Sequence, residues 1–211
     1  MEPKIPLMIL PYLPCIAWVQ HAMQSDMVLL EANEHYIKQS YRNRTRILSA
    51  NGVQALQIPV LHASGKQKIT EIETDPNENW KRNHWQSIES AYNKSAFFMY
   101  YRDYFEPFFE GATQVNLWEH NMGLLNVIFK ILKIQIRFEP TLIYEKNPEI
   151  LLDLRDAFQC KNKTPETELL FNKKYLQVFT QKFPFESNLS VLDLIFNMGP
   201  DAGRYLRGAF K

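Results

Sequence analysis

The chain has 211 residues, a length at which one domain is the default and about 70% of the unfolded chain's surface can be buried. Hydrophobic residues make up 45% of the sequence and charged residues 22%, which excludes a disordered or low-complexity chain. The 24 Lys and Arg residues against 23 Asp and Glu give a formal net charge of +1, so no global field favours binding to nucleic acid or to anionic lipid.

The N-terminal part of the chain predicts a β-α-β unit. An apolar run over residues 5–10 predicts a buried strand, which ends where Pro11 and Pro14 impose a non-helical loop. Apolar residues at helical spacing predict a helix over 16–23, and a second apolar strand is expected over 27–31. Such units usually hold parallel strands with a ligand crevice at their carboxyl ends. The opening run is too short to cross a membrane and lacks the cleavage signature of a signal peptide, so we expect a cytoplasmic protein without membrane insertion.

The next segment changes to short extended pieces. Asn51 and Gly52 separate an extended piece at 46–48 from an alternating run at 53–60. An Asn-Gly pair between two such runs is the strongest short-range signal for a β-hairpin. The polar loop at 62–68 that follows is a candidate lid over a site.

Beyond this loop the pattern predicts mainly helices. The helix over 79–93 begins after the capping residues of 75–77, and the helix over 96–109 is strongly aromatic. The aromatic stretch 97–109 suits either a core face or the contact face of a homodimer. In chain order we expect extended structure over 69–74 and helices over 79–93, 96–109 and 116–132. Residues 134–138 and 142–144 could form one strand interrupted by Pro140, or a strand and a loop. The expected elements after these are a helix over 148–157, a surface loop over 158–167, a helical or irregular stretch over 168–185, and helices over 190–197 and 201–207.

Together these elements predict an α/β fold with a parallel-stranded β-α-β core, an inserted β-hairpin and covering helices, which is compatible with a three-layer arrangement. The sequence contains no internal repeat that would indicate a solenoid. We expect a single domain over residues 1–211, with a sheet-rich half at 1–75 and a mainly helical half at 76–211.

The densest polar segment, residues 31–44, begins where the second strand is expected to end. Glu31, Lys38, Arg42 and Arg44 would bring a carboxylate, an ammonium and two guanidinium groups to the crevice. Guanidinium groups bind phosphates and carboxylates through paired hydrogen bonds, so the segment is a candidate anion site. The same composition also suits a solvated connection between the strand and the hairpin.

The helix over 79–93 carries a second candidate. Trp80, His84, Ile88 and Tyr92 follow one another at a spacing of four residues and therefore share a face. His84 is then expected beside aromatic rings. In that position it could serve as an acid or base, or as a hydrogen-bonded structural group.

Other catalytic and cofactor motifs are missing from the sequence. The five histidines show no HExxH or similar spacing, so we expect no metal site. The seven glycines form no GxSxG, GxGxxG or GxxxxGK motif, which excludes the nucleophile and nucleotide sites built on them. Cys15 and Cys160 are too few and too far apart for a disulfide framework. No cofactor is identified by any of these patterns.

Five segments of the chain resemble the WbqC-like protein family, in the form met in Bacteroidetes. They are residues 10–14, 36–44, 57–60, 80–92 and 189–200, among which KQSYRNR and the LDLIFN-x-GP ending are the most specific. The family is associated with surface-polysaccharide (O-antigen) gene clusters. The opening also resembles, distantly, the HUP-type α/β fold of nucleotidyltransferases, but Ala17 and Trp18 stand where the HxGH motif of that fold would end, so nucleotidyl transfer by that route is not expected.

The resemblance implies a role in surface-polysaccharide biosynthesis. Within that setting our leading hypothesis is an enzyme, a transferase or ligase that moves an acyl, aminoacyl or similar group to a sugar or nucleotide-sugar. The alternative is a non-catalytic ligand-binding or structural partner protein in the same pathway. The expected ligand is a small sugar or nucleotide-type molecule. The catalytic candidates are His84 as general base, Lys38, and Glu31 as an orienting group. The candidate ligand-binding residues, which supply guanidinium, amide and aromatic groups, are Tyr12, Tyr36, Tyr41, Arg42, Asn43, Arg44, Trp80, Trp85 and Tyr92.

Overall fold

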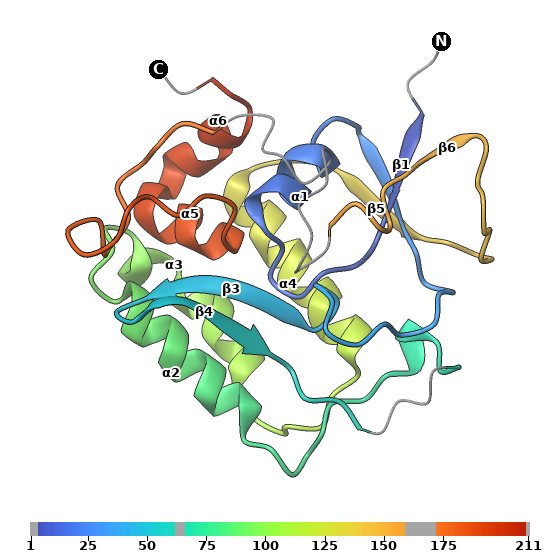
Figure 1. The fold of residues 1–211 in the computed structure, drawn as a ribbon, viewed down its shortest axis with the longest axis horizontal. Coiled ribbons are helices and arrows are strands. Elements are labelled where there is room, and N and C mark those ends of the chain that lie inside the picture. Colours follow the sequence, from blue (N-terminus) through green and yellow to red (C-terminus); the bar gives the residue numbers. More distant parts are fainter. Residues whose placement is uncertain (1–3, 62–65, 159–171, 210–211) are drawn as a thin grey trace.

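The computed structural model describes residues 4–61, 66–158 and 172–209, which form a mixed α/β fold (Figure 1). A parallel four-stranded sheet, an antiparallel hairpin and covering helices confirm the predicted fold class and are consistent with a three-layer α/β arrangement. Residues 62–65 of the candidate lid and most of the surface loop expected over 158–167 lie outside the described residues.

The central sheet has the strand order β5-β2-β1-β6, and every pair of neighbours is parallel. Its strands are β1 (Ile5–Met8), β2 (Met27–Leu30), β5 (Arg137–Pro140) and β6 (Leu151–Asp153), and α1 (Ile16–Ala22) connects β1 to β2 as predicted. The strand expected over 134–138 is found, slightly later, as β5. Leu7 lies opposite Leu29, and Leu29 opposite Glu139, so these three side chains share one face of the sheet.

The predicted hairpin is present and forms a separate two-stranded sheet from β3 (Arg44–Ser49) and β4 (Gly52–Gln57). Its turn requires a left-handed backbone at Gly52, where φ is +101°, a conformation that favours glycine. The Asn51-Gly52 signal in the sequence is therefore confirmed.

The other regular elements of the described chain are helices. They are η1 (Ile69–Glu71), α2 (Trp80–Tyr92), α3 (Phe98–Phe105), η2 (Glu106–Phe109), α4 (Leu117–Leu132), α5 (Val191–Met198), η4 (Gly199–Asp201) and α6 (Ala202–Leu206), where η marks a 3-10 turn. α3 is shorter than the helix expected over 96–109, because Pro107 lies in the 3-10 turn that follows it. Residues 172–185 contain no helix or strand. None of the helices in the described ranges has both the length and the apolar character needed to cross a membrane.

Helices α1 and α4 cover one face of the central sheet (Figure 1). Phe138 of β5 points to this face, where its ring stacks on Trp18 of α1 and meets Phe129 of α4 edge-on. Val28, on the same face, is fully buried. The connection between β5 and β6, residues 141–150, borders the opposite face. The carboxyl edge and this opposite face are therefore the parts of the sheet on which a site can be built.

The prediction of a helix over 148–157 is wrong, because part of this segment is strand β6. Leu151 pairs with Ile5 and Asp153 pairs with Leu7. The apolar spacing of the segment is compatible with a helix. Pairing with β1 instead satisfies backbone groups along an edge of β1 that would otherwise lack partners.

One shorter prediction also differs from the structure. Residues 69–71 form a 3-10 turn rather than extended structure, because the Glu71 carboxylate accepts a hydrogen bond from the Lys68 N–H at 3.3 Å and favours a helical start. Residues 142–144 form no strand and lie exposed in the β5–β6 connection, so of the two alternatives for 134–144 the structure has the strand followed by a loop.

The aromatic stretch of α3 and η2 has two different sides. The buried residues are Phe98, Phe105 and Phe109, and the exposed ones are Met99, Tyr100 and Tyr104. One side of the stretch therefore contributes to the core, which confirms the expectation of a core face. A homodimer contact through the other side stays a prediction.

Candidate functional site

The carboxyl ends of the four parallel strands meet at one edge of the sheet, and polar residues stand at three of these ends. Glu31 follows β2, Thr141 follows β5, and Asp153 ends β6 two residues before Arg155. The N–H of Glu31 donates to the carbonyl of Met8, the last residue of β1, at 2.9 Å, so the pairing continues past the strands. We call Glu31, Asn33, Thr141, Asp153 and Arg155 the carboxyl-end site.

Glu31 is fully buried, and its carboxylate is held from several sides. Its Oε1 accepts hydrogen bonds from the Thr141 hydroxyl at 2.7 Å and from the Asn33 N–H at 2.9 Å. Its Oε2 forms an ion pair with the Arg155 guanidinium at 3.0 Å. A buried carboxylate is tolerated when it is both paired and hydrogen-bonded, and Glu31 meets both conditions. It therefore fixes the orientation of Arg155.

The Arg155 guanidinium joins three groups. Besides Glu31 it pairs with Asp153 at 2.6 Å, and it lies over the Tyr144 ring, 4.9 Å from the ring centroid. Hydrogen bonds from Arg155 lower the pKa of Asp153, and Asp153 in turn raises the pKa of the guanidinium. The guanidinium therefore stays charged, and carboxylates on two sides orient its planar fork.

A second buried pair, Glu34 and Arg42, lies next to the carboxyl-end site. Nε of Arg42 donates to Oε1 of Glu34 at 2.6 Å, and Nη2 donates to Oε2, so the contact is bidentate. Burial raises the pKa of Glu34, an effect that the Arg42 hydrogen bond and charge oppose. The charges of Glu31 and Arg155 also act on this pKa, the first raising and the second lowering it. The two ion pairs therefore form one polar region.

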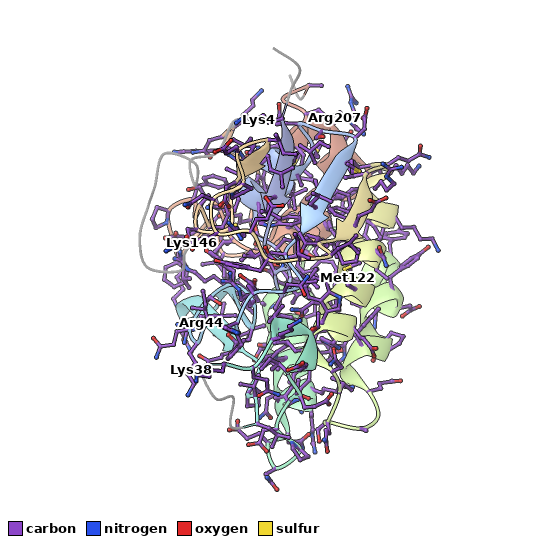
Figure 2. The ribbon with its side chains drawn as sticks, turned by 90° about the vertical axis from the view of Figure 1, so that its right-hand side faces the viewer. Lys4, Lys38, Arg44, Met122, Lys146 and Arg207 are labelled. Atoms are coloured by element: carbon purple, nitrogen blue, oxygen red, sulfur yellow. The ribbon has the colours of Figure 1, made fainter. Side chains whose placement is uncertain are left out.

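Basic side chains lie along one side of these pairs at the surface. Nζ of Lys68 donates to Oδ1 of Asn33 in the carboxyl-end site at 3.2 Å. Figure 2 shows Lys146, Arg44 and Lys38 along one side of the face that carries the β5–β6 connection. We call Lys38, Arg44, Lys68 and Lys146 the basic rim. Because the carboxylates inside are paired, the rim favours an anionic ligand at this edge.

A different polar cluster lies inside the core. We call Tyr12, Trp80, His84 and His120 the histidine cluster. The Tyr12 hydroxyl donates to Nδ1 of His84 at 2.9 Å, and we assign the other ring N–H of His84 to the backbone of Gln57. The Trp80 ring stands edge-on to both histidine rings, at centroid distances of 5.5 and 5.3 Å. Both nitrogens of His84 are therefore in use within the fold.

Burial decides the charge of these two histidines. Burial lowers the pKa of His84 to about 4, and the hydrogen bond to the backbone of Gln57 opposes this fall by raising the pKa. It lowers the pKa of His120 to about 3, and the nearby Lys81 ammonium adds to this fall. Both imidazoles are neutral near neutral pH. No three His, Cys, Asp or Glu side chains of the described ranges are grouped so that they could hold a metal ion.

The structure distributes the predicted site residues over three places. Close to the carboxyl-end site and its rim lie Glu31, Tyr36, Lys38, Arg42 and Arg44. In the histidine cluster lie Tyr12, Trp80 and His84. The third group, buried elsewhere in the fold, consists of Tyr41, Asn43, Trp85 and Tyr92. Tyr36 belongs to the first group, because the charges of Arg42 and Arg44 act against the burial that raises its pKa to about 12.

The residues of the third group are engaged within the fold. Trp85 stacks on Phe98 and Phe109 at centroid distances of 6.1 and 5.6 Å. Tyr92 packs against Phe196 at 5.3 Å. These two aromatic side chains therefore lie away from the carboxyl edge of the sheet.

Tyr41 and Asn43 tie the polar segment to its neighbours. The carbonyl of Tyr41 accepts a hydrogen bond from the Tyr12 N–H at 2.8 Å, and the Asn43 side-chain amide donates to the Ile58 carbonyl at 2.8 Å. Both side chains are buried. They position the segment 31–44 against β4 and the loop after β1.

Sequence reasoning missed three residues of the carboxyl-end site, namely Thr141, Asp153 and Arg155. Two of them fell within the helix wrongly expected over 148–157. Glu31 was singled out because polar residues after a parallel strand lie at the ligand-binding edge of the sheet. The same rule would have found Asp153 and Arg155 if a strand had been predicted at 151–153.

These features define a class of protein: an α/β fold with helices over one face of a parallel sheet and a charged site at the carboxyl ends of its strands. Within this class the chain belongs to the WbqC-like protein family, whose model matches residues 11–163. The resemblance inferred from the motifs is thereby confirmed. The chain is 27% identical over 219 residues to "Uncharacterized protein Rv1507c" of Mycobacterium tuberculosis, a match that covers 93% of this chain and 94% of that protein. No solved structure gives a significant match.

Proposed function

We propose that this protein is a cytoplasmic enzyme of surface-polysaccharide biosynthesis, of the O-antigen type, that transfers an acyl or aminoacyl-type group to a sugar or nucleotide-sugar. Membership of the WbqC-like family supports the polysaccharide setting. The observation that carries the placement of the site is the buried Arg155–Glu31 pair at the carboxyl ends of the parallel strands. Ligands of open α/β sheets bind outside this edge.

The basic rim would hold the anionic part of the donor. Lys38 and Lys68 are exposed, and Arg44 is half-buried beside them on the hairpin. Ammonium groups bind phosphates as point charges, whereas a guanidinium binds them through two parallel hydrogen bonds. A phosphate or diphosphate of a nucleotide-sugar or an acyl carrier fits this arrangement. Arg155, held from two sides, would then orient the group nearest the sheet.

In the proposed reaction a hydroxyl or amine of the acceptor sugar attacks the carbonyl carbon of an activated donor. A new ester or amide bond forms, the bond from that carbon to the leaving group breaks, and the leaving group takes its electron pair. The proton of the acceptor passes to Glu34, because burial raises the pKa of this carboxylate and so makes it a stronger base. Arg42 keeps the carboxylate in one orientation.

His84 has a positioning role in this proposal rather than the role of general base. Tyr12 and the backbone of Gln57 occupy its two ring nitrogens. Lys38 remains a ligand for donor phosphate, and Glu31 remains the orienting carboxylate, here of Arg155. Trp80, Trp85 and Tyr92 contribute to the core and not to a stacking surface for sugar.

The second candidate is a ligand-binding protein without chemistry in the same pathway. It is favoured by one observation: Glu31, Glu34, Arg42 and Arg155 are already engaged in buried ion pairs. Such pairs can hold a ligand in place without exchanging a proton with it. A binder would retain its ligand in Glu34→Gln and would yield no product with any donor and acceptor, whereas an enzyme would lose turnover in that variant.

The first experiment is a thermal-shift screen of the purified protein against nucleotides, nucleotide-sugars, acyl-coenzyme A esters and amino acids. A ligand at about 100 times its dissociation constant should add about 2.7 kcal/mol to the free energy of unfolding. We expect a shift with phosphate-bearing donors that is reduced in Arg44→Ala. The matched control is Lys94→Ala, an exposed cation that follows α2. Shifts confined to phosphate-free compounds, or equal losses in the two variants, would contradict the proposed site.

A further inference from the structure

A pocket of about 280 Å³ lies beside the carboxyl-end site, between the sheet and the β5–β6 connection. Its inner side consists of Leu7, Leu29 and Leu151, and its outer side includes Leu142 and Ile143. Leu7 lies opposite Leu29 in the register, and side chains alternate along a strand, so these leucines lie on the face away from α1 and α4. The pocket therefore has apolar walls on both sides.

The outer wall of the pocket exposes large apolar side chains. Leu142 is 92% exposed and Ile143 is 65% exposed. Single exposed apolar residues are ordinary on a protein surface, but here two neighbours extend a wall of buried and half-buried leucines. A concave apolar surface next to a few polar groups is the usual form of a small-molecule site.

The polar lining of the pocket is acidic. It consists of Thr141 and the carboxylates Glu31, Glu139 and Glu145. Glu139 is paired with Arg137 at 3.0 Å, and Glu31 with Arg155. Glu145 has no ion pair within the ranges that the structure describes. Since Glu31 and Glu139 are paired, Glu145 is the one carboxylate among the described lining residues without an ion pair, and no lysine or arginine is among them. The charge of Glu145 therefore attracts cations to the pocket and repels phosphates and carboxylates.

The volume limits what can enter. Pockets that take whole small-molecule ligands usually measure about 300–1,000 Å³, and this one lies just below that range. It can accept a group of the size of one hydrophobic amino acid, whereas a complete nucleotide-sugar would have to extend outside it. The acidic pocket and the basic rim thus suit two different parts of a substrate.

We propose that this pocket binds an apolar group that carries a protonated amine, such as a hydrophobic aminoacyl group whose carboxyl end is not free. The leucine and isoleucine side chains would contact its hydrocarbon part, and Glu145 would pair with its ammonium. This inference rests on the proposed function and narrows the transferred group from acyl or aminoacyl to aminoacyl.

The test compares three probes of one shape in the full chain. Leucinamide carries an ammonium, 4-methylpentanamide is neutral, and 4-methylpentanoate is an anion. Binding is measured by protein-observed NMR titration at about pH 6.5, where an α-amino group is protonated. We expect leucinamide to bind with a dissociation constant of the order of millimolar, the neutral amide about two- to fivefold more weakly, and the anion most weakly of all. Equal or tighter binding of the anion overturns the proposal, as does the absence of leucinamide binding.

Charge reversal at Glu145 gives the sharper result. Glu145→Lys should weaken the binding of leucinamide about five- to tenfold and strengthen the binding of 4-methylpentanoate, because the new ammonium repels the cation and attracts the anion. The matched control is Glu149→Lys in the same connection, which makes the same change of net charge at an exposed residue outside the pocket. The control should bind leucinamide like the unaltered protein. An equal effect of both variants overturns the assignment of Glu145.

A further variant tests the apolar wall without endangering the fold. Leu142→Ser should weaken leucinamide and 4-methylpentanamide by the same factor, since Leu142 is exposed and contacts the part that both share. Measurements on the unaltered protein separate the two proposals. If leucinamide does not bind but a phosphate-bearing donor does bind at the rim, this pocket alone is rejected, whereas failure of the donor to bind rejects the proposed function.

Discussion

The carboxyl-end site and the histidine cluster both bury ionisable side chains, but they do so in opposite ways. In the carboxyl-end site Glu31 and Arg155 keep their charges by pairing at 3.0 Å with further hydrogen bonds around them. In the histidine cluster no carboxylate of the described ranges forms an ion pair with His84, and burial removes its charge by lowering its pKa to about 4. The side chains of the first site therefore keep their charges, whereas the two imidazoles of the cluster are neutral.

This difference indicates which region can act on a ligand. A charged guanidinium at the carboxyl ends of parallel strands can bind an anion, and the basic rim around it strengthens that tendency. A neutral imidazole whose nitrogens are both bonded within the fold mainly fixes the packing of α2 against the loop after β1. Four changes would break or sharpen this contrast, and they are taken from the largest expected effect to the smallest.

The largest effect is expected from Arg155→Leu. This change leaves Glu31 buried without its cation, and breaking one partner of a buried pair costs about 3–5 kcal/mol. Denaturant unfolding should show this loss in the free energy of unfolding. The double change Glu31→Leu with Arg155→Leu should recover much of it, because no buried carboxylate is then left unpaired, and Asp153, which also loses its partner, is exposed to solvent. The control is Arg137→Leu, which removes the partner of an exposed pair and should cost less than about 1 kcal/mol. Equal losses for the two single variants would contradict the contrast.

The next effect concerns the pH dependence that His84 imposes. Its pKa in the fold, about 4, lies below the ordinary value of 6.5, so the folded protein resists protonation. The stability that depends on the neutral imidazole is present above pH 6.5 and is lost as the pH falls toward 4, in total about 3 kcal/mol. His84→Gln cannot titrate, so its free energy of unfolding should fall less steeply over this range than that of the unaltered protein. His120 is present in both proteins, but the charge of His84 also lowers its pKa, so the difference between the two curves includes this interaction between the imidazoles. Parallel curves would show that the imidazole is not held neutral.

Asp193 should make the free energy of unfolding depend on pH in the opposite direction to His84. It is a buried carboxylate that accepts hydrogen bonds from Tyr175 at 2.6 Å and Gln177 at 2.9 Å, and burial raises its pKa to about 6. Because this pKa lies above the ordinary value of 3.8, the contribution to stability is fully present below pH 3.8 and is lost as the pH rises through 6, in total about 3 kcal/mol. Relative to Asp193→Asn, the unaltered protein should therefore become less stable between pH 4 and pH 7. Urea unfolding at four pH values measures the difference, and a flat difference would contradict it.

The sequence predicted the elements whose signals are local. The first strand, α1 and the hairpin at Gly52 depend on apolar runs and turn residues within about twenty positions, and they are confirmed. β6 could not be predicted in the same way, because Leu151–Asp153 becomes a strand only through pairing with a segment some 146 residues earlier, as in the pair Ile5 and Leu151. Burial is equally non-local, which is why the sequence did not reveal that Trp85 and Tyr92 belong to the core.

The same reasoning explains what could be predicted of the site. Glu31 and the basic segment after it were identified because they directly follow a strand. Arg155 was missed because its place depends on β6. The neutral state of His84 was also beyond prediction, since it depends on burial by residues far away in the sequence, such as Tyr12, which contacts it from 72 positions away. Spacing indicated which face His84 shares, but not that the cluster is closed to solvent.

The smallest effect on stability is expected at the basic rim, where charges are exposed rather than buried. Lys68→Ala should change the free energy of unfolding by less than about 0.5 kcal/mol, because its bond to Asn33 lies at the surface. The same change should weaken a phosphate-bearing ligand about two- to fivefold at low salt and have less effect at high salt, where exposed charges are screened. Calorimetric titration of inorganic pyrophosphate at two salt concentrations measures this, with Lys94→Ala as the control. If Lys94→Ala lowers the affinity for pyrophosphate as much as Lys68→Ala does, the attraction comes from the net charge of the protein and not from the rim. The contrast between the two regions would then not indicate where a ligand binds.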